Sequence, residues 1–475
     1  MGDKLEYDYV IIGSGAAGGT IFDKLSNLNK NVLLIDQGSC LNNYDRNNFF
    51  FHSLKKFWKY SGYQYARGNI SLPILQGISV GGSTTINGSI MQDLDQNFCL
   101  QLNKEIDVKN KRYEYENLLN YQKEIKNELK ISDDTQKNLN SGTLQEFVKS
   151  YGWNSRIQNI AEPDEKDHMR SLSGNSIETH LLRKFKKHNI LSSTEVKKII
   201  LEKKNITGIN CYDKINKKKF FIKVKKKLIL SCGVIATANL LKNSNIKNGN
   251  IGKKFSCHLS GAIDAFIPKN KNITSKNSQA LEIITNDKIF KNFASQKIPN
   301  EILLTRLPED NLEFYHNNLD MISSWVFNIS TNSSGYLKKS FGGYNLHYDI
   351  SRKELKDVKS FIILISKFLF DMGAEIIFPN IISDKNDGLR NLNDLKQLLD
   401  RSVPQDFLLT SSHLYGTTCF GKNHNSGVID ENFRVFGYDN LHIVDSGIFP
   451  FPTKSNPQLT IMIYAKLASD LISRE

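Results

Sequence analysis

The side chains best suited to chemistry lie between residues 411 and 475. His413 precedes a Gly-Thr pair, and Asn456 directly precedes a proline and an apolar segment. A neutral imidazole, with an ordinary pKa of ~6.5, can accept a proton, and a carboxamide can orient a hydroxyl and stabilise developing alkoxide charge. Side chains of these two types can accept a proton and donate a hydrogen bond at a reaction centre. A lone histidine is more often structural, so His413 by itself does not establish such a site.

Two other histidines of this segment are better explained by packing and solvent exposure. His442 lies inside an apolar strand pattern and His424 lies in a polar loop. We expect the first to be structural and the second to lie on the surface.

A glycine-rich motif near the N-terminus predicts a dinucleotide site. An apolar run at 9–12 is followed by Gly13-Ser-Gly15-Ala16-Ala17-Gly18, a predicted helix to about residue 28, and a second apolar run ending at Asp36. In this βαβ pattern Gly13 permits a tight turn, Gly15 lets the backbone approach a pyrophosphate, and Gly18 lets the helix pack against the strand. The phosphates would bind at the helix N-terminus.

The acid at the end of the second run narrows the choice of cofactor. Asp36 can accept hydrogen bonds from a ribose 2′-hydroxyl and would repel a 2′-phosphate, which leaves FAD or NAD and disfavours NADP. The early position of the unit and Gly38, two residues after the acid, favour FAD.

Further segments can line the same cofactor. Residues 76–89 are dense in Gly, Ser and Thr, so their backbone N–H groups are accessible. Residues 228–237 combine a buried strand, a Gly-containing turn and a helix start, which can give a second backbone contact. Asn456 and Pro457 are typical of the N-cap and first position of a helix running to Ile472, whose positive end would stabilise a reduced flavin.

The other patterns predict supporting elements. We expect helices at 112–132, 175–188 and 354–371, the last with Gly373 as its C-cap. We expect strands at 190–196, 197–201, 206–212, 218–224, 280–285, 321–329 and 344–350. Residues 266–404 show no nucleotide-binding signal and form the candidate substrate domain.

Composition bounds the class of protein. The chain has 475 residues, 39% hydrophobic residues and a net charge of +14, which fits a globular protein of two to three domains with a lysine-rich surface. The charge weakly favours an anionic substrate or partner, but no nucleic-acid module is present. The six cysteines show no metal-ligand spacing or C-x-x-C-H haem motif, so no metal is expected. No signal segment or apolar run of ~20 residues is present, which predicts a cytoplasmic protein without an integral membrane segment.

Three separated blocks together resemble the glucose–methanol–choline (GMC) family of flavoprotein oxidoreductases: 13–36, 77–88 and 413–461, with weaker matches at 228–236, 250–258 and 371–374. The resemblance implies that His413 and Asn456 face the flavin. It also implies FAD held by Gly13, Gly15, Ala16, Ala17, Gly18 and Asp36, with Gly82, Ser83, Asn87 and Pro457 near the flavin ring, Val196 near the adenine and Asp445 near the cofactor rim.

Two departures from the family pattern matter. Ile86 stands where some members have a histidine covalently linked to flavin, which implies non-covalent FAD. Asp36 replaces the more common Glu, a conservative change. His258 resembles a family position away from the chemistry.

The resemblance implies an α/β fold, α+β overall. A Rossmann-like FAD-binding domain (1–100, 175–265 and 405–475) would carry a discontinuous substrate-binding domain (101–174 and 266–404) built on an antiparallel sheet with helices. The expected activity is FAD-dependent oxidation of an alcohol or sugar CH–OH group, by hydride transfer to flavin N5 with His413 as general base. Oxygen, a quinone or a cytochrome would accept the electrons. The alternatives are a hydroxynitrile-lyase-like enzyme on the same fold and a redox-inactive binding protein, although the presence of both His413 and Asn456 argues against the latter.

Overall fold

The structure is a computed structural model. The residues that it describes are 5–41, 50–132, 141–157, 160–161, 177, 181–182, 184–185, 189–268, 281–285, 291–296, 300–307, 309, 312–332, 334–340, 343–382 and 388–474. The predicted helix at 175–188 falls mostly outside these ranges.

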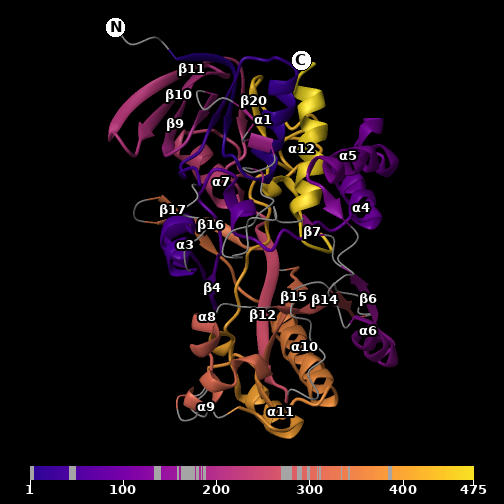
Figure 1. Ribbon diagram of the computed structural model, residues 1–475. Coiled ribbons are helices and arrows are strands. Elements are labelled where there is room, and N and C mark those ends of the chain that lie inside the picture. Colours follow the sequence, from indigo (N-terminus) through magenta and orange to yellow (C-terminus); the bar gives the residue numbers. More distant parts are fainter. Residues whose placement is uncertain are drawn as a thin grey trace.

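A seven-stranded sheet forms the upper part of the molecule in Figure 1. Its strands are β1 (Glu6–Ile12), β2 (Val32–Ile35), β8 (Ile190–Leu191), β9 (Thr194–Glu202), β10 (Asn205–Asp213), β11 (Lys218–Leu230) and β20 (Leu441–Ile443). The order is β8-β2-β1-β11-β10-β9, with β20 also paired to β11. β1 is parallel to β2 and β11, whereas β9, β10 and β11 form an antiparallel meander. β2, β20 and the carboxyl ends of β1 and β11 are apolar and buried, as strands covered on both faces require.

Three helices connect and cover this sheet. α1 (Ala16–Asn27) follows β1, α7 (Val234–Asn243) follows β11, and α12 (Gln458–Ile472) ends the chain beside α1. The α1 helix can approach closely because a Cβ on Gly18 would lie 1.8 Å from the carbonyl oxygen of Gly13. The predicted βαβ unit and the Rossmann-like fold are thus confirmed.

A second seven-stranded sheet occupies the lower part of the molecule and is antiparallel. It contains β6 (Asn154–Ile157), β12 (Ser256–Phe266), β13 (Leu281–Ile284), β14 (Lys291–Gln296), β15 (Ile322–Ser330), β18 (Ile376–Phe378) and β19 (Leu414–Tyr415). The long helix α10 (Arg352–Asp371) packs Phe361 and Phe368 against aromatic residues of β14 and β15. β12 lies in this sheet although the predicted boundaries put it with the FAD-binding segments, and the division into domains remains a prediction.

Two small sheets and further helices complete the described part of the fold. Two small sheets are formed by β3 (Tyr65–Arg67), β4 (Ser71–Pro73), β16 (Tyr336–Ser340) and β17 (Gly343–His347), and by β5 (Ile131–Ser132) with β7 (Ile160–Ala161). The other α-helices are α3 (Phe50–Phe57), α4 (Gln96–Ile106), α5 (Tyr115–Glu128), α6 (Ser141–Ser150), α8 (Asn300–Leu304), α9 (Leu312–Asn317) and α11 (Leu392–Arg401). Short 3₁₀ turns lie at Lys59–Gly62, Gly82–Thr85, Lys111–Tyr113, Leu319–Met321, Pro404–Asp406 and Ser446–Ile448.

Several predicted boundaries need correction. The strands predicted at 190–196 and 197–201 divide earlier, because Ser193 takes a left-handed φ of 51° between β8 and β9. The helix at 112–132 is a 3₁₀ turn followed by α5, and the strand at 344–350 ends at His347. The helix at 354–371 is confirmed with a capping box of Ser351 and Glu354. Among the described residues, no helix is both long and apolar enough to cross a bilayer.

Candidate active site

The two glycine-rich loops lie against each other at the carboxyl ends of the parallel strands. Gly82 has a φ of 57°, and a Cβ there would lie 2.9 Å from the Cα of Gly15. The Gly81 N–H donates to Ser14 Oγ at 2.9 Å, and Ser14 Oγ donates to Asp36 Oδ2 at 2.6 Å. One buried carboxylate therefore fixes both loops.

Asp36, the acid that follows β2, accepts hydrogen bonds from the backbone around it. Ser14 N–H donates to Asp36 Oδ2 at 2.9 Å, and Gly38 N–H donates to Oδ1 at 2.7 Å. Burial raises the pKa of Asp36, and the hydrogen bonds from Ser14 and Gly38 oppose that shift. Asp36 thus acts locally as a clamp on the glycine loop, and its predicted contact to a ribose can use only the remaining capacity of Oδ1.

A second buried acid has the same arrangement. Asp445 accepts from Thr237 Oγ1 at 2.5 Å, from Gly233 N–H at 3.0 Å and from Gly447 N–H at 2.8 Å. Burial raises the pKa of Asp445, against these hydrogen bonds. Asp445 therefore joins the start of α7 to the segment after β20, at the rim where sequence analysis expects the cofactor.

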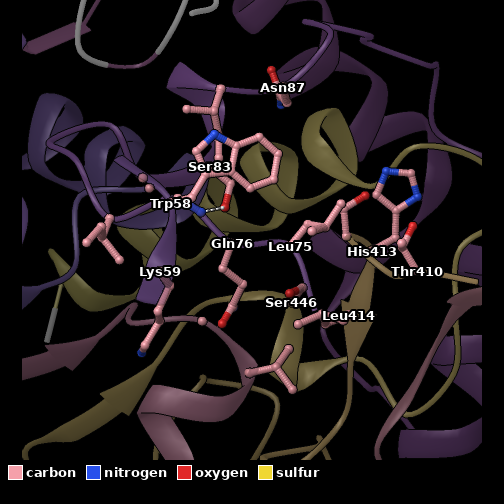
Figure 2. Close-up of a pocket in the computed structure, with 18 of the residues that line it drawn as sticks. Trp58, Lys59, Leu75, Gln76, Ser83, Asn87, Thr410, His413, Leu414 and Ser446 are labelled. Atoms are coloured by element: carbon pink, nitrogen blue, oxygen red, sulfur yellow. Dashed lines mark hydrogen bonds between the residues drawn. The ribbon is translucent and has the colours of Figure 1, made fainter. Parts of the chain in front are cut away.

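One cavity of about 1770 Å³ is bounded by both glycine loops and by both layers of the fold. Pockets for single drug-sized ligands measure roughly 300–1,000 Å³, so this larger space can hold a dinucleotide and a substrate together. All of the predicted site residues line it except Gly18, which packs α1 against β1: Gly13, Gly15, Ala16, Ala17, Asp36, Gly82, Ser83, Asn87, Val196, His413, Asp445, Asn456 and Pro457. Figure 2 shows His413 and Lys59 at opposite sides of this space, with Trp58, Gln76 and Ser83 between them.

The cradle fits a dinucleotide. An added Cβ at Gly15 would meet nothing within 4 Å, so this glycine faces the open cavity, and no side chain caps the α1 helix that begins directly after it. A pyrophosphate can approach the backbone there only because Gly15 has no side chain.

The predicted pair of reactive side chains is brought together. Asn456 Nδ2 lies 3.4 Å from His413 Nε2, although the residues are 43 positions apart. The α12 helix begins at Gln458 with Pro457 as its cap, one residue later than predicted, and the Asn456 side chain contacts His413 instead of capping the helix.

The environment of His413 differs from the sequence expectation. Burial, and next the proximity of His258, lower the pKa of His413 to about 3, well below the ordinary value used above. The imidazole is therefore neutral over the whole physiological range.

His258 is the main site residue that sequence reasoning misplaced. Its Nδ1 lies 3.1 Å from His413 Nδ1, so it is adjacent to the reactive pair and not away from it. The two histidines are 155 residues apart and meet because β12 pairs with β19, a contact that neither segment signals alone.

Three other cavity residues had no signal in the sequence. Gln458 accepts from Asn87 Nδ2 at 2.5 Å and so joins the second glycine-rich loop to α12. Trp58 and Lys59 come from a segment without periodicity, and burial lowers the pKa of Lys59.

His424 is exposed and His442 is fully buried, as predicted. Among the described residues, no three His, Cys, Asp or Glu side chains are grouped as metal ligands.

Comparisons with known proteins identify one family. The sequence patterns of GMC oxidoreductases match residues 7–260 and 339–465. An uncharacterised GMC-type oxidoreductase of Sinorhizobium fredii is 23% identical over 97% of this chain and 94% of its own length. A long-chain-alcohol oxidase of Arabidopsis thaliana is 20% identical over 99% of this chain and 68% of its own.

Solved structures show the same fold. A formate oxidase structure covers 100% of this chain and 99% of its own, with a TM-score of 0.74 and 14% identity. Pyridoxine 4-oxidase from Mesorbium loti covers 99% of both chains, with a TM-score of 0.72 and 15% identity. The chain therefore belongs to the GMC oxidoreductases, FAD flavoproteins, and is an enzyme that acts on CH–OH donors.

Proposed function

We propose that this enzyme oxidises the CH–OH group of a small alcohol or sugar, with His413 as the general base and Asn456 as the residue that orients the hydroxyl. The observation that carries the proposal is the 3.4 Å approach of Asn456 Nδ2 to His413 Nε2 on the wall of the cavity that also contains the glycine loops. Both groups can contact one hydroxyl placed beside them on the cavity side.

The roles of the chain's own residues follow from this placement. The loop at 13–17 and the start of α1 would hold the pyrophosphate, while Asp36 and Val196 would lie at the adenosine end and Gly82, Ser83, Asn87, Asp445 and Pro457 around the flavin. Bound FAD supplies the hydride acceptor. His413 Nε2 takes the hydroxyl proton, and the Asn456 amide donates to the oxygen as negative charge develops there.

Attachment of FAD is proposed to be non-covalent. Ile86, which lines the cavity, has no nucleophilic group. Cys232 also lines it, but burial, together with Asp445 and Asp36, raises the pKa of its thiol to about 12, and a thiol is a far weaker nucleophile than a thiolate. Denatured protein should release all of its flavin. A cytoplasmic location and oxygen as the electron acceptor complete the proposal, the latter supported by the oxidases among the relatives.

The test is anaerobic reduction of the bound flavin by a panel of alcohols and sugars. We expect at least one to bleach the oxidised-flavin absorption, and His413→Ala to slow that bleaching by roughly 10²-fold or more while FAD stays bound. His424→Ala, an exposed histidine, is the matched control and should behave like the wild type. Unchanged bleaching in His413→Ala would exclude His413 as the base, and turnover without bleaching would identify the lyase alternative.

A further inference from the structure

Two imidazoles meet in the wall behind Asn456. The rings of His258 and His413 lie edge to face, with centroids 5.2 Å apart and an interplanar angle of 84°. Pairing of β12 with β19 holds the two residues side by side, and the backbone N–H of His258 donates to the backbone oxygen of His413 at 3.1 Å. His258 is only 1% exposed, so it can act on the cavity only through His413.

The partners of this pair determine which nitrogens carry protons when both rings are neutral. His258 Nε2 lies 2.8 Å from the carbonyl oxygen of Thr453, which has no hydrogen, so Nε2 must donate. A neutral imidazole has a single N–H, so His258 Nδ1 accepts and His413 Nδ1 donates to it. The lone pair of His413 is then on Nε2, the atom that Asn456 approaches.

Both rings are neutral near pH 7. Burial lowers the pKa of His258 to about 4, and burial with the nearby His258 lowers that of His413 to about 3. The Thr453 carbonyl partly opposes the effect at His258. The Thr453 carbonyl oxygen, which accepts from His258 Nε2–H, would also stabilise a positive charge on the His258 ring.

The carbonyl that orients His258 is itself held in place. Thr453 Oγ1 donates to the backbone oxygen of Ser455 at 2.6 Å, so the hydroxyl of Tyr415, 2.7 Å away, donates to Thr453 Oγ1. The same turn continues into Asn456. One hydrogen-bonded turn thus positions both the Asn456 amide and the carbonyl that fixes His258.

We propose that His258 is a positioning residue that holds His413 as the Nδ1–H tautomer and receives its positive charge during the reaction. The inference rests on the proposed function of His413. In the balanced step the substrate O–H bond breaks as an N–H bond forms at His413 Nε2, and the Nδ1–H bond of His413 breaks as one forms at His258 Nδ1. One proton enters the pair, no electrons are exchanged within it, and His258 keeps its Nε2–H bond to Thr453.

Two substitutions separate this role from simple packing. His258→Asn places an amide oxygen near the former Nδ1, where it can accept from His413 but cannot take a proton. His258→Leu fills the space with no acceptor. With an alcohol that bleaches the wild-type flavin, we expect His258→Leu to slow reduction on the order of 10²-fold, with FAD content and KM within about twofold of the wild type. The flavin of His258→Asn should be reduced about tenfold faster than that of His258→Leu.

Equal slowing in the two variants would show that His258 serves packing alone, and wild-type rates in both would remove it from the reaction. These outcomes are distinct from failure of the proposed function, in which His413→Ala itself leaves reduction unchanged.

A second measurement needs no substrate and no variant of His258. In holoenzyme with ¹⁵N-labelled histidine, the signals that disappear in His413→Ala identify the His413 ring. We expect them to show a protonated Nδ1 and an unprotonated Nε2 in the resting wild type. The opposite tautomer would overturn the proposal.

Discussion

The cavity has two walls that are built in opposite ways. The glycine wall consists of the loops at 13–17 and 77–88 with Asp36, and its polar contacts are mostly backbone N–H groups held by a carboxylate. The imidazole wall consists of His413 and Asn456 at the cavity with His258 packed behind His413, and its contacts are between side chains from strands and loops distant in sequence. Figure 2 shows Ser83 of the glycine wall beside Trp58, and His413 of the imidazole wall apart from both.

The difference separates binding from reaction. The glycine wall recognises a cofactor by its shape and by N–H donors, so almost any added side chain weakens cofactor binding. A side-chain wall depends on which atoms carry protons, so an isosteric substitution can leave its shape intact and still change the chemistry. Substitutions in the glycine wall should thus produce enzyme without bound FAD. Substitutions in the imidazole wall should leave FAD bound but slow its reduction.

The largest effect is expected from Gly15→Val. The space beside Gly15 is open, so the fold should persist, while the new side chain occupies the path of the pyrophosphate. We expect the purified protein to lack FAD and its Kd for added FAD to rise by about 10²-fold or more. The matched control is Gly249→Val, because Gly249 has equally open space, lies in an exposed turn and does not line the cavity. A fully loaded Gly15→Val protein would contradict the assignment of the glycine wall.

A smaller effect is expected from Asp36→Asn. The amide nitrogen cannot accept a hydrogen bond, so one donor from Ser14 or Gly38 loses its partner, at a cost of about 1–3 kcal/mol. If that cost falls on the loop in its binding conformation, the Kd for FAD, measured by fluorescence titration, rises by about 5- to 150-fold. Ser14→Ala should weaken binding less, and the double variant should be less than additive because both residues belong to one chain of hydrogen bonds. Strict additivity would argue against the clamp.

The same contrast explains what could be predicted from the sequence. The glycine wall was readable because Gly13, Gly15, Gly18 and Asp36 lie within one βαβ unit, where local spacing determines position. The position of Asn456 beside His413 followed only from resemblance to a family. The contact with His258 could not be predicted, because it depends on the register between β12 and β19 and on the turn at Thr453. The lowered pKa of His413 was also out of reach, because burial of a side chain in a loop has no local signature.

The finest distinction between the walls is their response to acid. Burial raises the pKa of Asp36, so this carboxyl group of the glycine wall becomes protonated at a higher pH than an ordinary carboxyl group. At His413 burial lowers the pKa to about 3, and the base is active when unprotonated, so the imidazole wall keeps its reactive form. As pH falls, FAD affinity should therefore decline while reduction of the enzyme that remains loaded stays constant within about twofold between roughly pH 5.5 and 8. An imidazole with the ordinary pKa of ~6.5 would instead lose about tenfold by pH 5.5. Stopped-flow reduction at saturating substrate, beside FAD titrations at each pH, measures both quantities. An acid limb near pH 6.5 in the reduction rate would show that the base is not the buried, neutral His413 described above.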